Sequence, residues 1–331
     1  MENNSLKGKC ILITGGTGSF GNALIEYLFK LKTKPRRVVV FSRDELKQFE
    51  MQKKYSSKNY LNLRFFLGDV RDKERLRSAL KGVDVVIHAA ALKQVPTAEY
   101  NPIEYIKTNI LGAQNIIEEC IDSNVSRVIA LSTDKASSPV NLYGATKLCS
   151  DKLFVSANNI KGKKNIRFSV VRYGNVFGSR GSVAPTFSKI EKKGTYFITD
   201  PDMTRFNITL KKSIEMVLWT IKNMEGGEIF VPKIPSYNIM QLVKAFNPNA
   251  KVKNIGIRAG EKLHEEMISI NEAINTVELK EYYAILNGYS KLKPKYKKIK
   301  YVKNGFYYNS GKNSNFLNIK ELQKLIKSEL K

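Results

Sequence analysis

The sequence predicts an α/β fold in which a doubly wound parallel sheet is joined to a smaller α/β lobe. Three observations lead to this prediction. Short apolar runs alternate with stretches of helical periodicity, a glycine-rich turn follows the first run, and 331 residues suffice for two domains. Runs that are apolar at almost every position are typical of parallel strands covered by helices on both faces.

The first half of the chain supplies most of the regular pattern. Strands are expected at residues 9–14, 38–42, 62–69, 83–90 and 127–133, with helices between them at 23–31, 73–80 and 110–123. Further strands are expected at 166–171 and 227–232, and further helices at 211–224, 239–246 and 261–267. We expect a sheet domain over residues 1–173 and a lobe over 174–331, some segments of which return to the sheet.

Composition excludes several classes of protein. No apolar run reaches the roughly 18 residues that span a bilayer, and no signal-peptide pattern is present, so a cytoplasmic protein is expected. Cys10, Cys120 and Cys149 lack the spacing of a metal site, so no metal is expected. The net charge is +26, but the lysines are spread along the chain. The dense run at 291–303 is interpreted as an exposed, mobile, solvated segment, and no nucleic-acid partner is expected.

The glycines at the first predicted turn have the spacing Gly15-x-x-Gly18-x-x-Gly21. Gly15 permits a tight exit from the strand, Gly18 lets the backbone approach a pyrophosphate, and Gly21 lets the helix pack closely on the strand. An ordinary strand-to-helix turn is the alternative. Because the turn lies between a strand and an amphipathic helix, we favour a dinucleotide-binding domain of the Rossmann type.

The end of the second strand bears on the choice of dinucleotide. Asp44 suits the ribose of NAD, whereas Ser42 and Arg43 suit the 2′-phosphate of NADP, and NADP is preferred. Asp69 and Val70, at the end of the third strand, are placed to hold the adenine, or Asp69 simply caps the following turn.

Tyr143 and Lys147 lie four residues apart in a predicted helix, so their side chains share one face. An ammonium beside a tyrosine stabilises the phenolate and lowers the pKa of the hydroxyl, which suits proton transfer. Lys147 would also hold the nicotinamide ribose. A surface pair is the alternative, but the preceding Thr133 at a strand end and the glycine turn favour an active site.

Nine motifs point in one direction. They are GGTGSFG (15–21), SRDELKQ (42–48), GDVRD (68–72), HAAA (88–91), AEYNP (98–102), STDKA (132–136), NLYGATK (141–147), RYGNV (172–176) and GIRAGEK (256–262). Together they resemble the inverting UDP-N-acetylglucosamine 4,6-dehydratases of pseudaminic acid biosynthesis, within the extended short-chain dehydrogenase/reductase family. The resemblance extends to about residue 285.

The resemblance implies a reaction and a catalytic set. Asp134-Lys135 marks the inverting type. Tyr143 takes the proton of the sugar 4-hydroxyl, oriented by Thr133, while hydride passes to the cofactor. Lys135, if burial lowers its pKa, removes the C5 proton, and Asp134, if its pKa is raised, protonates the departing C6 hydroxyl. Hydride returns to C6, and either Lys135 or Tyr143 protonates C5 on the opposite face.

The resemblance also implies the binding residues and the assembly. Contacts with the cofactor are expected from Gly15, Thr17, Gly18, Ser19, Phe20, Gly21, Ser42, Arg43, Asp69, Val70, Ala89, Lys93, Tyr143 and Lys147. Contacts with the UDP-sugar are expected from Lys93, Asn175, Arg205, Arg258 and Glu261. Gln94 and Asn207 depart from the family pattern on the expected sugar or dimer side. A homo-oligomer, a hexamer by analogy, is expected.

The two histidines are interpreted as structural. His88 is expected in the core beside the cofactor, and His264 on a helix face. Two other functions stay open: a 4-epimerase, or an inverting dehydratase, of another UDP-sugar, and a non-catalytic NADP-binding sensor. An epimerase has no need of Asp134-Lys135, because it removes no water, and a sensor has no need of Tyr143 and Lys147 either.

Overall fold

A computed structural model describes residues 6–56, 60–179, 181–191 and 193–330. Its centre is a nine-stranded sheet in the order β14-β15-β10-β6-β5-β4-β1-β2-β3. The strands are β1 (Cys10–Thr14), β2 (Arg37–Ser42), β3 (Leu63–Leu67), β4 (Val85–His88), β5 (Arg127–Thr133), β6 (Arg167–Tyr173), β10 (Ile229–Pro232), β14 (Thr276–Glu278) and β15 (Tyr282–Ile285). Every pairing from β3 to β10 is parallel, and only β15 runs antiparallel to its neighbours. The predicted doubly wound parallel sheet is confirmed.

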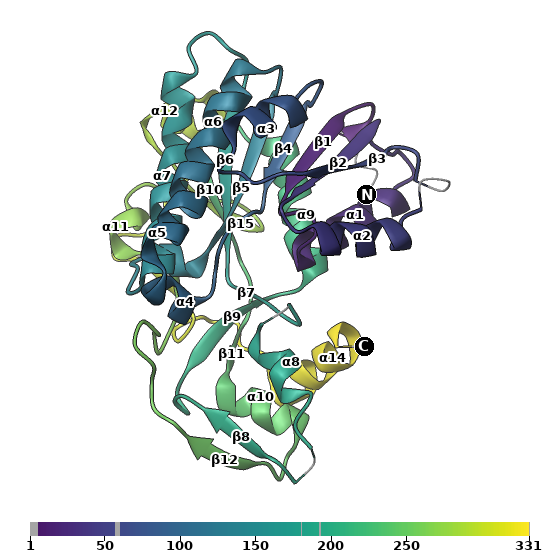
Figure 1. Ribbon diagram of the computed structural model, residues 1–331. Coiled ribbons are helices and arrows are strands. Elements are labelled where there is room, and N and C mark those ends of the chain that lie inside the picture. Colours follow the sequence, from purple (N-terminus) through teal and green to yellow (C-terminus); the bar gives the residue numbers. More distant parts are fainter. Residues whose placement is uncertain (1–5, 57–59, 180, 192, 331) are drawn as a thin grey trace.

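Helices cover both faces of this sheet (Figure 1). Helices α1 (Ser19–Lys30) and α9 (Leu210–Asn223) pack together on one face, near α2 (Glu45–Lys54). On the other face, α3 (Lys73–Ala79) and α7 (Leu142–Ile160) pack against α6, and η2 joins α6 to the short helices α4 and α5. These connecting helices are α4 (Val95–Tyr100), α5 (Pro102–Tyr105), the π-helical η2 (Ile106–Leu111) and α6 (Gly112–Asp122). The burial of β1 at every position follows from this double cover.

The strand order places the carboxyl ends of the central strands along one edge. Chain connections diverge between β1 and β4, where Thr14 lies opposite His88, and the two strands leave a crevice at their ends. On the neighbouring strands, Thr133 at the end of β5 lies opposite Tyr173 at the end of β6. Residues from four strands therefore meet at this edge.

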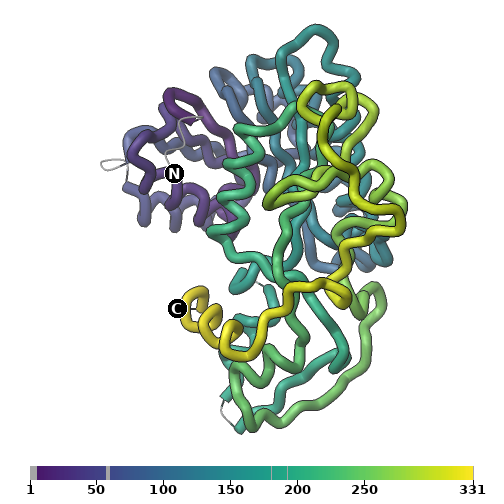
Figure 2. The backbone as a smooth tube through the Cα atoms, turned by 180° about the vertical axis from the view of Figure 1, so that it is seen from behind, coloured from purple at the N-terminus to yellow at the C-terminus, as the bar shows by residue number. Residues whose placement is uncertain are grey.

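The second half of the chain divides between the sheet and a smaller lobe with its own apolar core. The lobe contains β7 (Asn175–Val176), α8 (Val183–Phe187), β8 (Thr195–Ile198), β9 (Thr204–Ile208), β11 (Ser236–Asn238), α10 (Ile239–Phe246), β12 (Lys251–Asn254) and α14 (Ile319–Glu329). Figure 2 shows the C-terminal part of the chain passing from the sheet back to the lobe. Before the sheet strands β14 and β15, the chain forms β13 (Glu266–Ile268) and α11 (Ile270–Ala273). After them it forms α12 (Gly288–Lys291), α13 (Pro294–Lys297) and β16 (Tyr308–Asn309) on its way back to the lobe.

The helix predicted at 261–267 is wrong. Its end forms β13, which pairs with β16, and His264 bridges to Thr204 instead of lying on a helix face. The His264 Nδ1 atom lies 2.8 Å from the Thr204 hydroxyl. Helical propensity in this charged segment is overridden by pairing with strands distant in the sequence.

The lysine-rich segment 291–303 is not uniformly exposed, contrary to expectation. Tyr296, in α13, is 2% exposed, and its hydroxyl donates to Glu228 Oε1 at 2.9 Å. Glu228 is itself fully buried. Lysines project from this segment, but an aromatic anchor holds it to the core. None of the helices in the described ranges has both the length and the apolar character to cross a bilayer.

Candidate active site

A cavity of about 910 Å³ extends from the glycine turn after β1, past the end of β5, to the lobe. The expected site residues converge on it from parts of the chain that are far apart in the sequence. All of them line the cavity except Asp134, which lies directly behind its wall. The crevice at the carboxyl edge of the sheet is thus the mouth of one continuous site.

The glycine turn has the geometry of a phosphate cradle. Gly15 has a φ of +65°, and a Cβ there would lie 2.9 Å from the Ala90 Cα, so only glycine fits. A Cβ on Gly21 would meet the Gly16 carbonyl oxygen at 2.3 Å. Gly18, in contrast, has only the Gly15 oxygen nearby, at 3.2 Å, and no side chain caps helix α1, which starts at Ser19. Open backbone at a helix N-terminus fits a dinucleotide pyrophosphate.

The residues at the end of β2 divide their roles. Asp44 caps α2 and accepts from the Lys47 backbone at 3.0 Å, which occupies its carboxylate. The Ser42 hydroxyl lies 2.8 Å from the Thr17 hydroxyl. Arg43 remains half-exposed at the cavity, 3.6 Å from Asp69. The acidic group that would favour NAD is therefore engaged in the helix, and cations face the cavity.

Asp69 caps the turn after β3 and also lines the cavity. Its carboxylate accepts from the Arg71 backbone at 3.0 Å, as a turn cap does, and pairs with the Arg71 guanidinium at 2.8 Å. Burial raises the pKa of Asp69, but the bonds to Arg71 outweigh it and keep the pKa below its ordinary value. Asp69 and Val70 nevertheless line the cavity.

Helix α7 presents Tyr143 and Lys147 to the cavity. Asn141 caps the helix, accepting from the Gly144 backbone at 2.7 Å, so the helix begins at Leu142, one residue before Tyr143. Burial raises the pKa of Tyr143 to about 12, opposed by the charge of Lys135 and by the Thr133 hydroxyl. Burial lowers the pKa of Lys147. The expected lowering of the tyrosine pKa is not found, and the ammonium that favours its phenolate is Lys135.

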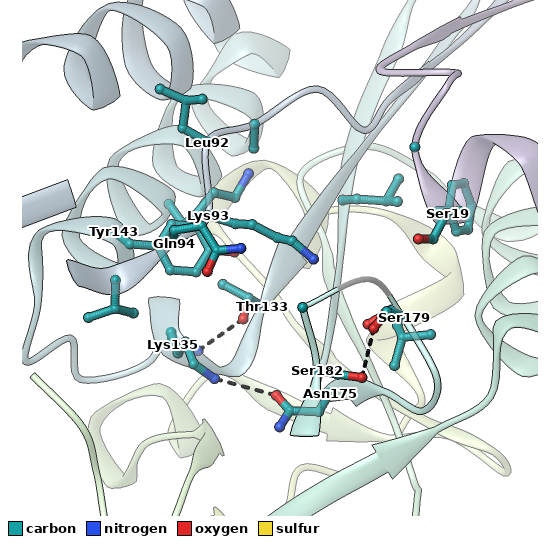
Figure 3. Close-up of a pocket in the computed structure, with 18 of the residues that line it drawn as sticks. Ser19, Leu92, Lys93, Gln94, Thr133, Lys135, Tyr143, Asn175, Ser179 and Ser182 are labelled. Atoms are coloured by element: carbon teal, nitrogen blue, oxygen red, sulfur yellow. Dashed lines mark hydrogen bonds between the residues drawn. The ribbon is translucent and has the colours of Figure 1, made fainter. Parts of the chain in front are cut away.

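Asp134 and Lys135 form the short 3₁₀ turn η3 (Asp134–Ala136) directly after β5. Lys135 Nζ lies 3.1 Å from Asp134 Oδ1 and 3.0 Å from Glu265 Oε1. A third contact, of 3.5 Å, joins it to Asn175 Oδ1, and Figure 3 shows this amine directed at Asn175. The Lys135 amine is therefore held by groups from three separate segments.

The charge state of this cluster differs from expectation for Lys135. Burial by itself would lower the pKa of Lys135, but the charges of Asp134 and Glu265 outweigh it, so the pKa is raised. For Asp134, burial raises the pKa in spite of Lys135, as expected. Glu265 stays ionised, because Lys135 and Arg205 overcome its burial and lower its pKa. The prediction for Lys135 failed because it did not include Glu265.

The residues expected to bind the UDP-sugar lie at the lobe end of the cavity. Arg205, in β9, donates to the Thr204 carbonyl at 2.7 Å, which fixes its orientation. Arg258 is mostly exposed and lies 3.6 Å from Glu261. Burial and the charge of Lys135 lower the pKa of Lys93. This end of the cavity carries an excess of cations, as an anionic ligand requires.

The two departures from the family pattern separate in the structure. Gln94 lines the cavity beside Lys93 (Figure 3), so it can influence ligand choice. Asn207 is buried in β9 and does not line the cavity. His88 is buried, as expected, with its Nδ1 atom 2.8 Å from the Thr14 hydroxyl. Burial lowers the pKa of His88 to about 3, so it is neutral.

Several cavity residues were missed from the sequence. Lys262 donates to the Ser137 carbonyl at 2.7 Å, and Glu265 contacts Lys135. Tyr173, at the end of β6, also lines the cavity, because it lies opposite Thr133 in the sheet. The motif GIRAGEK ends at Lys262, three residues before Glu265, and no periodicity in the sequence indicates that this carboxylate faces Lys135.

Comparisons with known proteins agree with this architecture. A model of the family described as "Polysaccharide biosynthesis protein" matches residues 11–287. The inverting UDP-N-acetylglucosamine 4,6-dehydratase of Campylobacter jejuni strain 81-176 is 54% identical over 329 residues, covering 96% of this chain and 97% of that protein. The UDP-glucose 4-epimerase of Rickettsia bellii strain RML369-C is 43% identical over 284 residues, covering 84% and 82%.

A solved structure extends the likeness to three dimensions. The X-ray structure of Pen from Bacillus thuringiensis superposes with a TM-score of 0.89 at 37% identity, covering 98% of this chain and 99% of the other. Family model, relatives and structure thus each match most of the chain. The chain belongs to the polysaccharide biosynthesis protein family, and its relatives include an inverting UDP-N-acetylglucosamine 4,6-dehydratase.

Proposed function

We propose that this chain is an inverting UDP-N-acetylglucosamine 4,6-dehydratase. The reaction oxidises C4, eliminates water across C5 and C6, and yields a UDP-4-keto-6-deoxy sugar with inverted C5. One observation carries the proposal: Lys135 lines the cavity together with Thr133 and Tyr143, and Asp134, behind the wall, is hydrogen-bonded to both Thr133 and Lys135. The Campylobacter relative of that name, at 54% identity, supports it.

We infer NADP as the cofactor. It supplies a nicotinamide that accepts hydride from C4 and returns hydride to C6. The glycine turn would hold the pyrophosphate, and Arg43 with Lys47 would face the 2′-phosphate. The engagement of Asp44 as a helix cap supports NADP over NAD. Lys147 would hold the nicotinamide ribose, close to Tyr143 on the same face of α7.

The first step belongs to Tyr143 and Thr133. The Thr133 hydroxyl orients the sugar 4-hydroxyl, and Tyr143 takes its proton as hydride leaves C4. The charge of Lys135 and the bond to Thr133 both favour the phenolate needed here. The ketone formed at C4 makes the neighbouring C5 proton acidic, which prepares the elimination.

Elimination breaks the C5–H and C6–O bonds. Lys135 takes the C5 proton, and the raised pKa of Asp134 keeps a proton available for the departing C6 hydroxyl, which leaves as water. Asp134 is 0% exposed, and the Thr133 hydroxyl donates to its Oδ1 at 3.0 Å. Thr133 would pass its own proton to the C6 hydroxyl and take up the proton of Asp134. Inversion requires that C5 regain a proton from the opposite face. We assign that step to Tyr143, which was protonated in the first step.

The test is nuclear magnetic resonance of the purified chain incubated with UDP-N-acetylglucosamine. We expect a 4-keto-6-deoxy product of inverted C5 without net cofactor consumption, and deuterium at C5 in deuterated water. Lys135→Ala should abolish elimination. Formation of UDP-N-acetylgalactosamine alone would overturn the dehydratase and favour a 4-epimerase, the activity named for the Rickettsia relative.

The setting of the reaction is part of the same proposal. We propose that the enzyme acts in the cytoplasm as a homo-oligomer, a hexamer by family analogy. Its product would enter pseudaminic acid synthesis and surface glycans such as those of flagellin. We also propose that residues 1–173 form the cofactor domain and that 174–331 supply mainly the sugar-binding lobe. Light scattering of the purified chain tests the assembly.

A further inference from the structure

Glu265 is a buried carboxylate to which the proposed reaction has so far given no task. It lies just before β13. Its backbone N–H donates to the Ser310 hydroxyl, and its carbonyl accepts from the Ser310 backbone, each at 2.8 Å. Its side chain is 3% exposed and lines the same cavity as Lys135. Burying a carboxylate is costly unless it is paired, so its position calls for a reason.

The contacts of Glu265 connect it to Lys135. Oε1 lies 3.0 Å from Lys135 Nζ and 3.7 Å from Arg205 Nε. Oε2 is buried and has no hydrogen-bond partner among the described residues, so the carboxylate retains an open acceptor position. Asp134 holds the same amine from the other side, at 3.1 Å. Lys135 thus bridges two carboxylates.

This arrangement bears on a difficulty in the elimination. Lys135 must be a neutral amine to take the C5 proton, yet the charge of the ionised Glu265 favours its ammonium form. It has to pass its own proton to a neighbour. Asp134 is held protonated for the leaving hydroxyl, Asn175 cannot take a proton, and Glu265 is ionised. Among the described residues, Glu265 is the remaining group within hydrogen-bonding distance of Lys135 Nζ that can accept this proton.

We propose that Glu265 is the proton acceptor behind Lys135, so that the C5 proton enters Lys135 as the proton of Lys135 moves to Glu265. The inference rests on the proposed dehydratase function. Glu265 acts through Lys135 and is in this sense a positioning residue. Before the substrate reacts, Asp134 holds the proton that the leaving hydroxyl needs, and the ionised Glu265 is ready to accept a proton from Lys135.

The step balances in atoms and charge. The C5–H bond breaks and an N–H bond forms on Lys135, while one of the original N–H protons moves to Glu265 Oε1. Asp134 loses its proton to the C6 hydroxyl, the C6–O bond breaks, and water leaves. The cluster then holds ionised Asp134, ammonium Lys135 and protonated Glu265. Transfer from Glu265 through Lys135 to Asp134 restores the starting state.

The test separates the hydride step from the elimination step. Glu265→Gln keeps the shape of the side chain and removes its ability to accept a proton. With UDP-N-acetylglucosamine and NADP⁺, we expect it to form reduced nicotinamide as the wild type does in its first turnover. Product formation and deuterium entry at C5 should fall about 100-fold or more. Loss of a structural contact would instead reduce both steps together.

Two further variants complete the design. Glu265→Asp keeps the carboxylate at a longer distance and should recover part of the C5 exchange. Glu266→Gln is the matched control, because Glu266 is the next residue and its carboxylate accepts from the Ser138 hydroxyl at 2.7 Å, away from Lys135. We expect wild-type turnover from this control.

The outcomes distinguish the two proposals. If the wild type itself gives no 4-keto-6-deoxy product, the dehydratase function is wrong. If the wild type gives that product and Glu265→Gln exchanges C5 deuterium at the wild-type rate, the role of Glu265 is refuted. Equal loss of nicotinamide reduction and C5 exchange in Glu265→Gln, without recovery in Glu265→Asp, would also refute it.

Discussion

Gly144, at the start of α7, tests how closely the site depends on the position of Lys135. The helix packs here directly against the η3 turn, and a Cβ added to Gly144 would lie 2.3 Å from the Lys135 carbonyl oxygen. Ordinary contact begins at 3.4 Å, so Gly144→Ala requires the η3 backbone and α7 to separate by about 1 Å. Pro139 Cβ, at 3.1 Å, limits movement in another direction.

The two consequences of this shift differ in size. Alanine favours a helix over glycine by about 1 kcal/mol, which offsets part of the roughly 1–3 kcal/mol that overpacking costs. The net change in the free energy of unfolding should therefore be at most about 2 kcal/mol. A catalytic group misplaced by about 1 Å can lose about 100-fold in rate. Turnover should thus fall far more than stability.

The assay compares Gly144→Ala with Gly288→Ala in α12, where an added Cβ has no neighbour within 4 Å. Product formation from UDP-N-acetylglucosamine is measured by magnetic resonance, and stability by denaturant unfolding. We expect slow turnover with retained folding for the first variant and wild-type behaviour for the second. Wild-type turnover by Gly144→Ala would refute the argument that the contact with α7 positions Lys135.

Three further predictions concern cofactor choice, pH and packing. Arg43→Ala should raise the KM for NADP about 10-fold or more and leave that for NAD nearly unchanged, measured by initial rates. His88 has a folded pKa of about 3 against 6.5 ordinarily, so only the unfolded chain gains its proton as pH falls below 6.5. Stability is therefore full above pH 6.5, and His88→Gln should remove about 2 kcal/mol of the loss between pH 6.5 and 5, measured by denaturant midpoints. Tyr296→Phe leaves Glu228 without one donor and should cost about 1–3 kcal/mol, seen as a lower melting temperature.

The sequence predicts the structure best where the pattern that defines an element lies within one short segment of the chain. The seven parallel strands of the central sheet lie within a few residues of their predicted positions, because a buried parallel strand is apolar at almost every position. The edge strands β14 and β15, which pair antiparallel, were not predicted. The glycine turn could be predicted for a similar reason. Its backbone leaves no room for a Cβ at Gly15 or Gly21, so the spacing of the glycines is visible within one short segment. The segment 261–267 was misread because its strand partner lies at Tyr308–Asn309.

By itself, the sequence determined the parallel strands of the sheet, the glycine turn, and the neighbouring residues Asp134-Lys135 and Tyr143 with Lys147. Each depends on spacing within a short stretch of chain. Only the tertiary structure decided the charge state of Lys135, because that depends on Glu265, which the fold brings to 3.0 Å from a distant segment. Proton affinity in a buried site is set by burial and by distances between charges, and both arise when the chain folds.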